Sequence, residues 1–185
     1  MFRKKSEELH YRGSLISLAT ATFEAPDGST FQRDIVHHPG AVSVVAVEQG
    51  DERGPQVILV RQYRAAIDQE LLEVVAGKRD VQDEPPETTA RRELAEEVGM
   101  IAGRLELLAE FYNSPGFCDE HSYIFLGLDL TPTAREAHGI EEQYMTIERV
   151  ALADVGSLIR RGEIVDAKTI IGLCLAREAL ATLEP

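Results

Sequence analysis

Three glutamates with helical spacing carry most of the chemistry that this sequence could perform. Residues 85–98 (PPETTARRELAEEV) begin with prolines and are followed by Gly99, a pattern that predicts a helix. On such a helix Glu93 and Glu97 are one turn apart, with Glu96 beside them. Carboxylates held this close repel each other, and hard divalent cations such as Mg²⁺ prefer oxygen ligands of this kind. Because acidic helix faces that only meet solvent are common, the triplet by itself favours a solvated surface over a metal site.

The residues around these glutamates extend the pattern. Residues 92–100 (RELAEEVGM) match REUxEExGU, where U is a bulky apolar residue, and Glu84 lies eight positions before Arg92. This spacing resembles the box of the Nudix hydrolase family, whose members cleave a nucleoside diphosphate linked to another group. Six residues separate Gly77 from Glu84, where the box usually has five, and we interpret the extra residue as a longer loop. The resemblance implies that Glu84 and Arg92 form a structural salt bridge.

The resemblance also implies a metal site. Glu93 and Glu97 would be the principal ligands, Glu96 a helper that acts directly or through water, and the backbone carbonyl of Ala76 a further ligand. The expected cofactor is Mg²⁺, with Mn²⁺ or Zn²⁺ as alternatives. Such ions reverse the local negative charge, lower the pKa of a bound water and stabilise the leaving phosphate.

Residues outside the box resemble those of the ADP-ribose pyrophosphatase subgroup. Pro115, Gly116 and Phe117 stand where that subgroup has a substrate-binding loop, although a simple Pro-Gly turn between two strands is the alternative. Arg64 ends the segment RQYR, where the resemblance implies that an arginine grips the pyrophosphate through its planar fork. Glu73, in LLEVVAG, either accepts bonds from the nucleoside or supports the loop.

The first forty residues are predicted to form a separate β unit. Segments 14–23 and 31–37 flank the turn APDGST, which predicts a hairpin. We therefore expect a small β subdomain over residues 1–40 and the Nudix domain over residues 41–185. The resemblance implies that the hairpin crosses to a partner subunit, that Arg33 contacts substrate, and that the protein is a homodimer.

The adenine-binding position has no aromatic residue in the first hairpin strand. Ile16 stands closest to the position where the subgroup often stacks an aromatic ring, and Phe31 or Tyr63 could substitute for it. The sequence leaves the mode of base binding open.

The segment 138–146 (HGIEEQYMT) resembles the mobile loop that supplies the catalytic base in this subgroup. Glu142 is the expected base, and its neighbour Glu141 is expected to be solvated. We interpret His138 as an incidental loop residue, and Glu96 is the first alternative if the loop does not supply the base.

The remaining elements predict an α/β or α+β sandwich. Short β-branched runs predict strands, and apolar stripes at helical spacing predict two helices near the end of the chain, the second with Asp166 as its cap. The resemblance specifies a Nudix α/β/α sandwich with a mixed sheet plus the N-terminal hairpin. The further strands are expected at 41–47, 57–63, 71–75, 104–112 and 122–128.

Composition limits the partners. The chain has 185 residues, with 32 Asp and Glu against 19 Lys and Arg, and a net charge of −13. This excess of acid argues against binding to nucleic acid or to a membrane surface. The two cysteines build no disulfide framework, and no signal peptide or membrane-spanning run is recognised, so we expect a cytoplasmic protein.

The expected function is Mg²⁺-dependent hydrolysis of ADP-ribose to AMP and ribose 5-phosphate. One alternative is a pyrophosphatase for another nucleoside diphosphate sugar. The alternative from a different class is a non-catalytic Nudix sensor that binds ADP-ribose. Sensors of that kind usually lose box glutamates and carry an added DNA-binding domain, whereas Glu93, Glu96 and Glu97 are all present and only residues 161–185 follow the first terminal helix.

Overall fold

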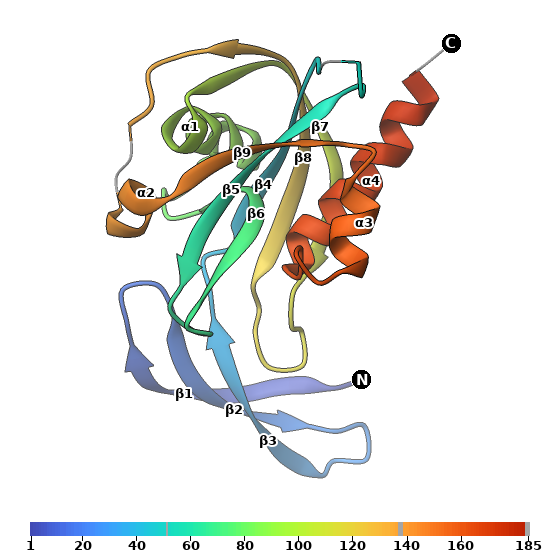
Figure 1. Ribbon diagram of the computed structural model, residues 1–185. Helices are drawn as coiled ribbons and strands as arrows, with labels where there is room; N and C mark the ends of the chain where they lie inside the picture. The colour runs from blue at the N-terminus through green and yellow to red at the C-terminus, as the bar shows by residue number, and fades with distance from the viewer. Residues whose placement is uncertain (51, 137–138, 184–185) are drawn as a thin grey trace. The chain divides into compact units, whose positions relative to one another are not determined.

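The computed structural model describes residues 1–50, 52–136 and 139–183, and Figure 1 shows the course of the chain. The chain divides into two compact units, each of which combines two segments. The first unit comprises Met1–Ala41 and Phe111–Ser122, and the second comprises Val42–Glu110 and Tyr123–Pro185. A segment far from the N-terminus in sequence therefore belongs with the N-terminal strands.

Nine strands and four helices are assigned within the described residues. The strands are β1 (Arg3–Arg12), β2 (Ser17–Glu24), β3 (Thr30–His37), β4 (Ala41–Glu48), β5 (Gln56–Arg64), β6 (Gln69–Lys78), β7 (Met100–Tyr112), β8 (His121–Pro132) and β9 (Thr146–Ala151). The helices are α1 (Pro86–Val98), α2 (Ile140–Tyr144), α3 (Val155–Arg160) and α4 (Ala167–Leu183). No helix in the described part of the chain is long and apolar enough to span a bilayer.

The second unit is a sheet covered by helices on both faces. Its six strands run in the order β7-β8-β4-β6-β5-β9, and Figure 1 shows α1 on one face and α3 and α4 on the other. Alternate residues of β4 and β5 supply the two apolar cores, as the period of a strand requires. Val44 and Ile58 pack with Leu94 of α1, whereas Val45 and Leu59 pack in the other core, with Leu173 of α4. The predicted α/β/α sandwich is confirmed.

Helix α1 begins and ends where the sequence indicates. Pro85 is extended and precedes the first turn, and Gly99 adopts a left-handed conformation with φ of 65° at the C-terminus. The amide of Gly99 donates to the carbonyl of Ala95 over 3.0 Å, which satisfies an end group of the helix. The glutamates of the box therefore lie on a helix whose last turn is closed by Gly99.

The first unit contains a three-stranded antiparallel sheet, not the two-stranded hairpin that the sequence predicts. Strands β2 and β3 pair in register, and β1 is added along the free edge of β2. The missed strand β1 (RKKSEELHYR) is exposed along its whole length, so it lacks the alternation of apolar and polar residues that marks a half-buried strand.

Candidate active site

Glu93 and Glu97 lie one turn apart on α1, and both are buried. Their exposed fractions are 8% and 4%. Burial raises the pKa of Glu93 to about 6, with the charge of Arg92 acting against the rise. Burial also raises the pKa of Glu97 to about 8, and the negative charge of Glu93 adds to that rise. Two carboxylates have therefore been removed from water without full compensation from the protein.

Gly77 allows the end of β6 to approach Glu93 closely. A Cβ atom at this position would lie only 1.9 Å from the carboxyl carbon of Glu93. The preceding residue, Ala76, donates its amide to Glu97 Oε2 over 3.3 Å. The strand end and the helix thus contact each other through both buried glutamates. Ala76, whose carbonyl the sequence analysis expects as a metal ligand, lies beside Glu97.

Arg92 connects the remaining acids of the box. Its Nη1 donates to Glu93 Oε1 over 2.9 Å and to Glu96 Oε2 over 3.0 Å, and its Nη2 lies 3.5 Å from Glu84. Glu84 also accepts a hydrogen bond of 2.7 Å from the hydroxyl of Thr89. The predicted salt bridge between Glu84 and Arg92 is therefore present, and it fixes the preceding loop to α1.

The donor set suits a hard divalent cation. Buried carboxylates are normally paired with a cation or bind a metal, and Mg²⁺ prefers such oxygen ligands. Within the described residues, no group of three or more His, Cys, Asp and Glu side chains is arranged around a common point. Arg92 donates a hydrogen bond to the carboxylate of Glu93 instead, and the amide of Ala76 donates one to the carboxylate of Glu97. Neither contact offsets the burial of Glu93 and Glu97, so the uncompensated carboxylate oxygens fit a metal ion.

Glu142 lies within electrostatic reach of the two buried glutamates. Its charge contributes to the raised pKa of both Glu93 and Glu97. It belongs to the short helix α2, where the sequence analysis expects a loop. His138 and the side chain of Glu141 lie outside the described residues.

Arg135 connects α2 to the end of α1, a link that the sequence does not reveal. Its Nε donates to the carbonyl of Glu97 over 2.6 Å, and its Nη2 donates to the carbonyl of Glu142 over 2.7 Å. Both bonds run to the backbone, so the position of α2 near α1 does not depend on the glutamate side chains.

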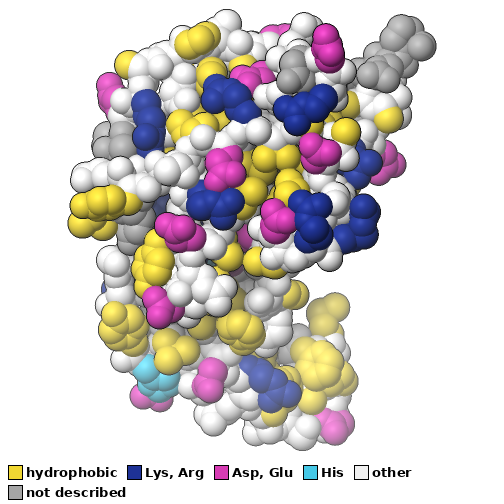
Figure 2. Space-filling view, in the orientation of Figure 1, with side chains coloured by type: hydrophobic (Ala, Val, Ile, Leu, Met, Phe, Trp, Pro, Cys, Tyr) yellow, Lys and Arg dark blue, Asp and Glu magenta, His cyan; other side chains and the backbone are white. Residues whose placement is uncertain are grey.

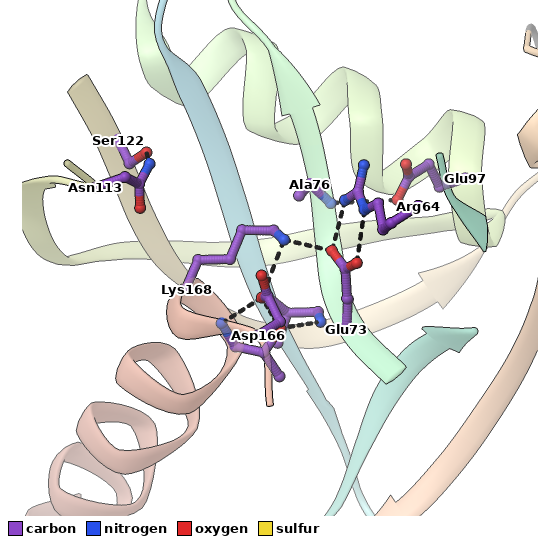
Figure 3. Close-up of polar contacts among 10 residues, drawn as sticks. Arg64, Glu73, Ala76, Glu97, Asn113, Ser122, Asp166 and Lys168 are labelled. Carbon is purple, nitrogen blue, oxygen red and sulfur yellow. Dashed lines mark hydrogen bonds and ion pairs between the residues drawn. The ribbon is translucent and has the colours of Figure 1, made fainter. Parts of the chain in front are cut away.

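Arg64 and Glu73 bind each other at the end of β5. Arg64 donates from Nε and Nη2 to the two carboxylate oxygens of Glu73, over 2.6 and 2.5 Å, in a bidentate pair. Glu73 is fully buried, and the side chain of Arg64 is 40% exposed. Lys168 also donates to Glu73, and Figure 3 shows the two basic side chains reaching this carboxylate from different sides. This favours the supporting role for Glu73 over direct contact with a nucleoside.

The other predicted substrate residues belong to the first unit. Arg33 lies in the middle of β3, with its guanidinium 4.7 Å from the ring centre of Phe31. Pro115, Gly116 and Phe117 form the turn of the segment Phe111–Ser122, and the amide of Phe117 donates to Ser114 over 3.1 Å.

The candidates for the adenine position differ in their surroundings. Phe31 stacks on Phe23 with ring centres 5.5 Å apart, so one of its faces is occupied. Tyr63 donates its hydroxyl to Asp68. Ile16 lines an open cavity of about 230 Å³ in the first unit. Arg12, Gly13, Leu15, Ser17, His37, His38 and Pro39 complete its lining.

Comparison with known proteins identifies the family whose pattern the box follows. The model of the NUDIX domain family matches residues 37–170. A Bacillus subtilis (strain 168) protein named ADP-ribose pyrophosphatase is 38% identical over 89% of this chain and 86% of its own length. A Mycobacterium tuberculosis (strain ATCC 25618 / H37Rv) protein of the same name is 37% identical over 98% of this chain and 85% of its own length.

A solved structure supports the fold over the whole chain. The crystal structure of an ADP compounds hydrolase superposes with a TM-score of 0.84, covering 99% of this chain and 96% of the other, at 24% identity. At this level of identity the likeness concerns the fold alone.

Proposed function

Because this chain belongs to the NUDIX domain family, we propose that it hydrolyses ADP-ribose to AMP and ribose 5-phosphate with the aid of Mg²⁺. The observation that carries the proposal is the pair of buried carboxylates on α1, Glu93 and Glu97, with Glu142 of α2 within electrostatic reach of both. The two relatives named ADP-ribose pyrophosphatase support ADP-ribose as the substrate.

Mg²⁺ would be held by Glu93 and Glu97, with help from Glu96 and the carbonyl of Ala76. When bound, the ion supplies a water of lowered pKa and offsets charge on the leaving phosphate. Mn²⁺ or Zn²⁺ could occupy the same oxygen ligands. Arg92 keeps Glu93 and Glu96 oriented, since it donates to both.

Glu142 acts as the general base in this proposal. It takes the proton of the attacking water, oxygen bonds to one phosphorus, and the bridging P–O bond breaks, which gives AMP and ribose 5-phosphate. Its charge lies within electrostatic reach of Glu93 and Glu97, so Glu142 is near the expected metal ligands, where the attacking water would be bound.

Residues outside the box would bind the substrate in this proposal. Arg64 would contact the pyrophosphate, with Glu73 holding the guanidinium in place. Arg33 and the turn at Pro115, Gly116 and Phe117 would bind the rest of the nucleotide sugar.

We further propose a homodimer formed through the first unit. A single-layer sheet needs a cover for its apolar side chains. Phe2, Leu9 and Tyr11 are between 48% and 62% exposed, and Figure 2 shows hydrophobic side chains on the surface of this unit. A second copy of the chain would cover these side chains and bring its own Arg33 to the substrate-binding site of the first copy.

The proposal is tested by a pair of variants of the box. Glu97→Gln keeps the size of the side chain but removes one ligand charge, so kcat for ADP-ribose with Mg²⁺ should fall by several orders of magnitude while the protein stays folded. Glu84→Gln is the matched control, because Glu84 only fastens the loop to Arg92 and Thr89. It should mainly lower Tm. Near-normal turnover in Glu97→Gln would refute the metal site.

A second candidate function is hydrolysis of another nucleoside diphosphate sugar by the same reaction. Another nucleoside diphosphate sugar would satisfy the same metal and phosphate contacts, since the base position of Ile16 has no stacking ring. Hydrolysis rates for ADP-ribose, GDP-mannose and ADP-glucose, measured side by side with Mg²⁺, separate the two. A preference for either of the other sugars over ADP-ribose would reject the substrate proposed here, and binding without turnover of any of them would favour the sensor.

A further inference from the structure

Four charged side chains form a compact network between β5, β6 and the start of α4. Arg64 binds Glu73 with two hydrogen bonds, Lys168 donates to Glu73 Oε2, and Lys168 also lies 3.0 Å from Asp166. Figure 3 shows the chain of contacts that runs from α4 through Glu73 to Arg64. Two acidic and two basic side chains are present, so the network is neutral as a whole.

Exposure decreases from Arg64 inward. The side chain of Arg64 is 40% exposed, that of Lys168 is 15% exposed, and Glu73 is completely buried. A buried carboxylate needs a full set of partners, because leaving a charge unpaired away from water is strongly destabilising. Arg64 and Lys168 share this task. Arg64 is the member of the pair that reaches solvent, and its Nη1 takes no part in the two bonds to Glu73.

Lys168 is itself fixed by the first turn of α4. Asp166 caps this helix, since its Oδ2 accepts from the amide of Thr169 over 2.9 Å and from its hydroxyl over 2.6 Å. The same hydroxyl accepts from the amide of Val74 over 3.0 Å, which joins the helix to β6 beside Glu73. The position of Lys168 is therefore set by two elements.

We propose that Lys168 is a positioning residue for the pyrophosphate-binding Arg64, acting through the carboxylate they share on Glu73. This rests on the proposed role of Arg64 in substrate binding. With Lys168 present, Glu73 and Asp166 are balanced, and Arg64 can direct part of its guanidinium toward an anionic ligand. Without Lys168, Arg64 is the one cation left in the network beside two carboxylates, and their attraction draws it away from the phosphate.

The kinetic consequence separates positioning from a general structural role. Arg64 would contact the pyrophosphate in both ground and transition states, so misplacing it should raise KM more than it lowers kcat. A loss of packing alone would lower Tm without acting through Arg64. Because Lys168 acts through Arg64 in this proposal, its removal should have no further effect once Arg64 has been replaced.

The test is a double-mutant cycle with Lys168→Met, Arg64→Met and the double variant, assayed with ADP-ribose and Mg²⁺ at constant ionic strength. Lys168→Met should raise KM about tenfold with a smaller change in kcat, and Lys168→Arg should restore most of the affinity. The double variant should match Arg64→Met. Arg177→Met removes the same charge from an exposed position of α4 and should leave KM unchanged. If Lys168→Met unfolds below the assay temperature, Lys168→Gln replaces it, because it retains an N–H donor.

Each other outcome contradicts a specific step. If Arg64→Met raises KM and Lys168→Met does not, the positioning role of Lys168 is wrong, while the proposed contact between Arg64 and the substrate stands. Effects that add in the double variant would show that Lys168 acts independently of Arg64. Wild-type kinetics in Arg64→Met would show that Arg64 does not contact the pyrophosphate. The positioning role of Lys168 would then be wrong as well. In that case hydrolysis of ADP-ribose by the wild-type protein would still support the reaction itself.

Discussion

Glu97 illustrates how a single residue can favour function over stability. In the folded protein its pKa is raised to about 8, mainly by burial, compared with 4.5 for an ordinary glutamate. A raised pKa means that Glu97 contributes stability below pH 4.5, and that this contribution is lost as the pH rises through 8. The metal-free protein should therefore lose stability across this range.

We predict that Glu97→Gln has a higher Tm than the wild-type protein at pH 8.5 in EDTA, by several degrees, and nearly the same Tm at pH 5. The reason is that glutamine resembles the protonated glutamate and has no charge to bury. For a chain of this size, 1 kcal/mol of free energy moves Tm by about 2–4 °C. Thermal melts at the two pH values measure the effect.

Mg²⁺ provides the control for this prediction. At pH 8.5 it should raise the Tm of the wild-type protein but not that of Glu97→Gln, because ligands stabilise the state that binds them. Equal stabilisation of both proteins would place the ion elsewhere. A wild-type Tm that does not change between pH 5 and 8.5 in EDTA would show that burial of Glu97 is compensated.

Glu142 is predicted to serve the chemical step. Glu142→Gln should lower kcat by roughly 10²–10⁴-fold with little change in KM, the range expected when an acid–base group is removed. Glu141→Gln, which changes the adjacent residue of α2 in the same way, is the matched control and should lose much less. Steady-state kinetics at saturating Mg²⁺ measure both. Small and equal losses would move the base to α1, with Glu96 as the first alternative.

At the scale of elements, the sequence predicts the helices and strands whose own residues mark their ends and their buried face. Helix α1 has prolines before its first turn, a left-handed glycine after its last, and Leu94 facing the core. Strand β1 has no such signal, because it is exposed along its whole length and lacks the alternation of apolar and polar residues that marks a half-buried strand. Asp166 was predicted as a cap and is one.

The predictable part of the site lies in the box itself, and the rest depends on tertiary contacts. Fixed spacing on one helix is enough to place Glu93 and Glu97 together. Lys168 meets Glu73 across 95 positions, and Arg135 meets the carbonyl of Glu97 across 38. No periodicity links such residues, so a single sequence carries no signal for these contacts.

Strand β3 and the turn at residues 114–119 are joined by a contact whose strength depends on pH. The amide of Val36 donates to Phe117, and His37 Nδ1 lies 2.5 Å from Asp119 Oδ2. Hydrogen bonding to Asp119, with a smaller contribution from Glu7, raises the pKa of His37. The stabilisation is therefore complete below pH 6.5 and is lost as the pH rises through the raised value.

We predict that Asp119→Asn lowers Tm at pH 6 and flattens its dependence on pH between 6 and 9. Asn cannot favour the charged form of His37 as a carboxylate does, so the part of the pH dependence that comes from this pair disappears. Glu120→Gln removes the same charge from the next residue and should keep the wild-type profile. Thermal melts across this pH range test the prediction. An unchanged slope of Tm against pH in Asp119→Asn would mean that the pair with His37 contributes nothing to folding.

At the scale of the whole molecule, net charge and substrate charge have the same sign. The chain carries a net charge of −13, and a nucleoside diphosphate sugar is also anionic. The net charge of the protein therefore cannot attract the substrate, because like charges repel. Binding must come from local reversals of charge, and the structure offers them at Arg64 and, once a cation is bound, at α1. Activity should accordingly depend steeply on the concentration of Mg²⁺.

The first unit gives the last prediction, which concerns assembly. Strand β1 is exposed along its whole length, so an isolated chain would leave the apolar side chains of Leu9 and Tyr11 in water. If a second copy covers this sheet, the protein is an obligate homodimer whose interface is large and self-complementary. Light scattering should give twice the chain mass of 20.5 kDa at assay concentrations. Leu9→Asp and Tyr11→Asp should shift the protein toward monomers and lower activity together, because each pocket would lose the partner's Arg33. A monomer that retains full activity, in the wild-type protein or in these variants, would exclude a pocket completed by the partner.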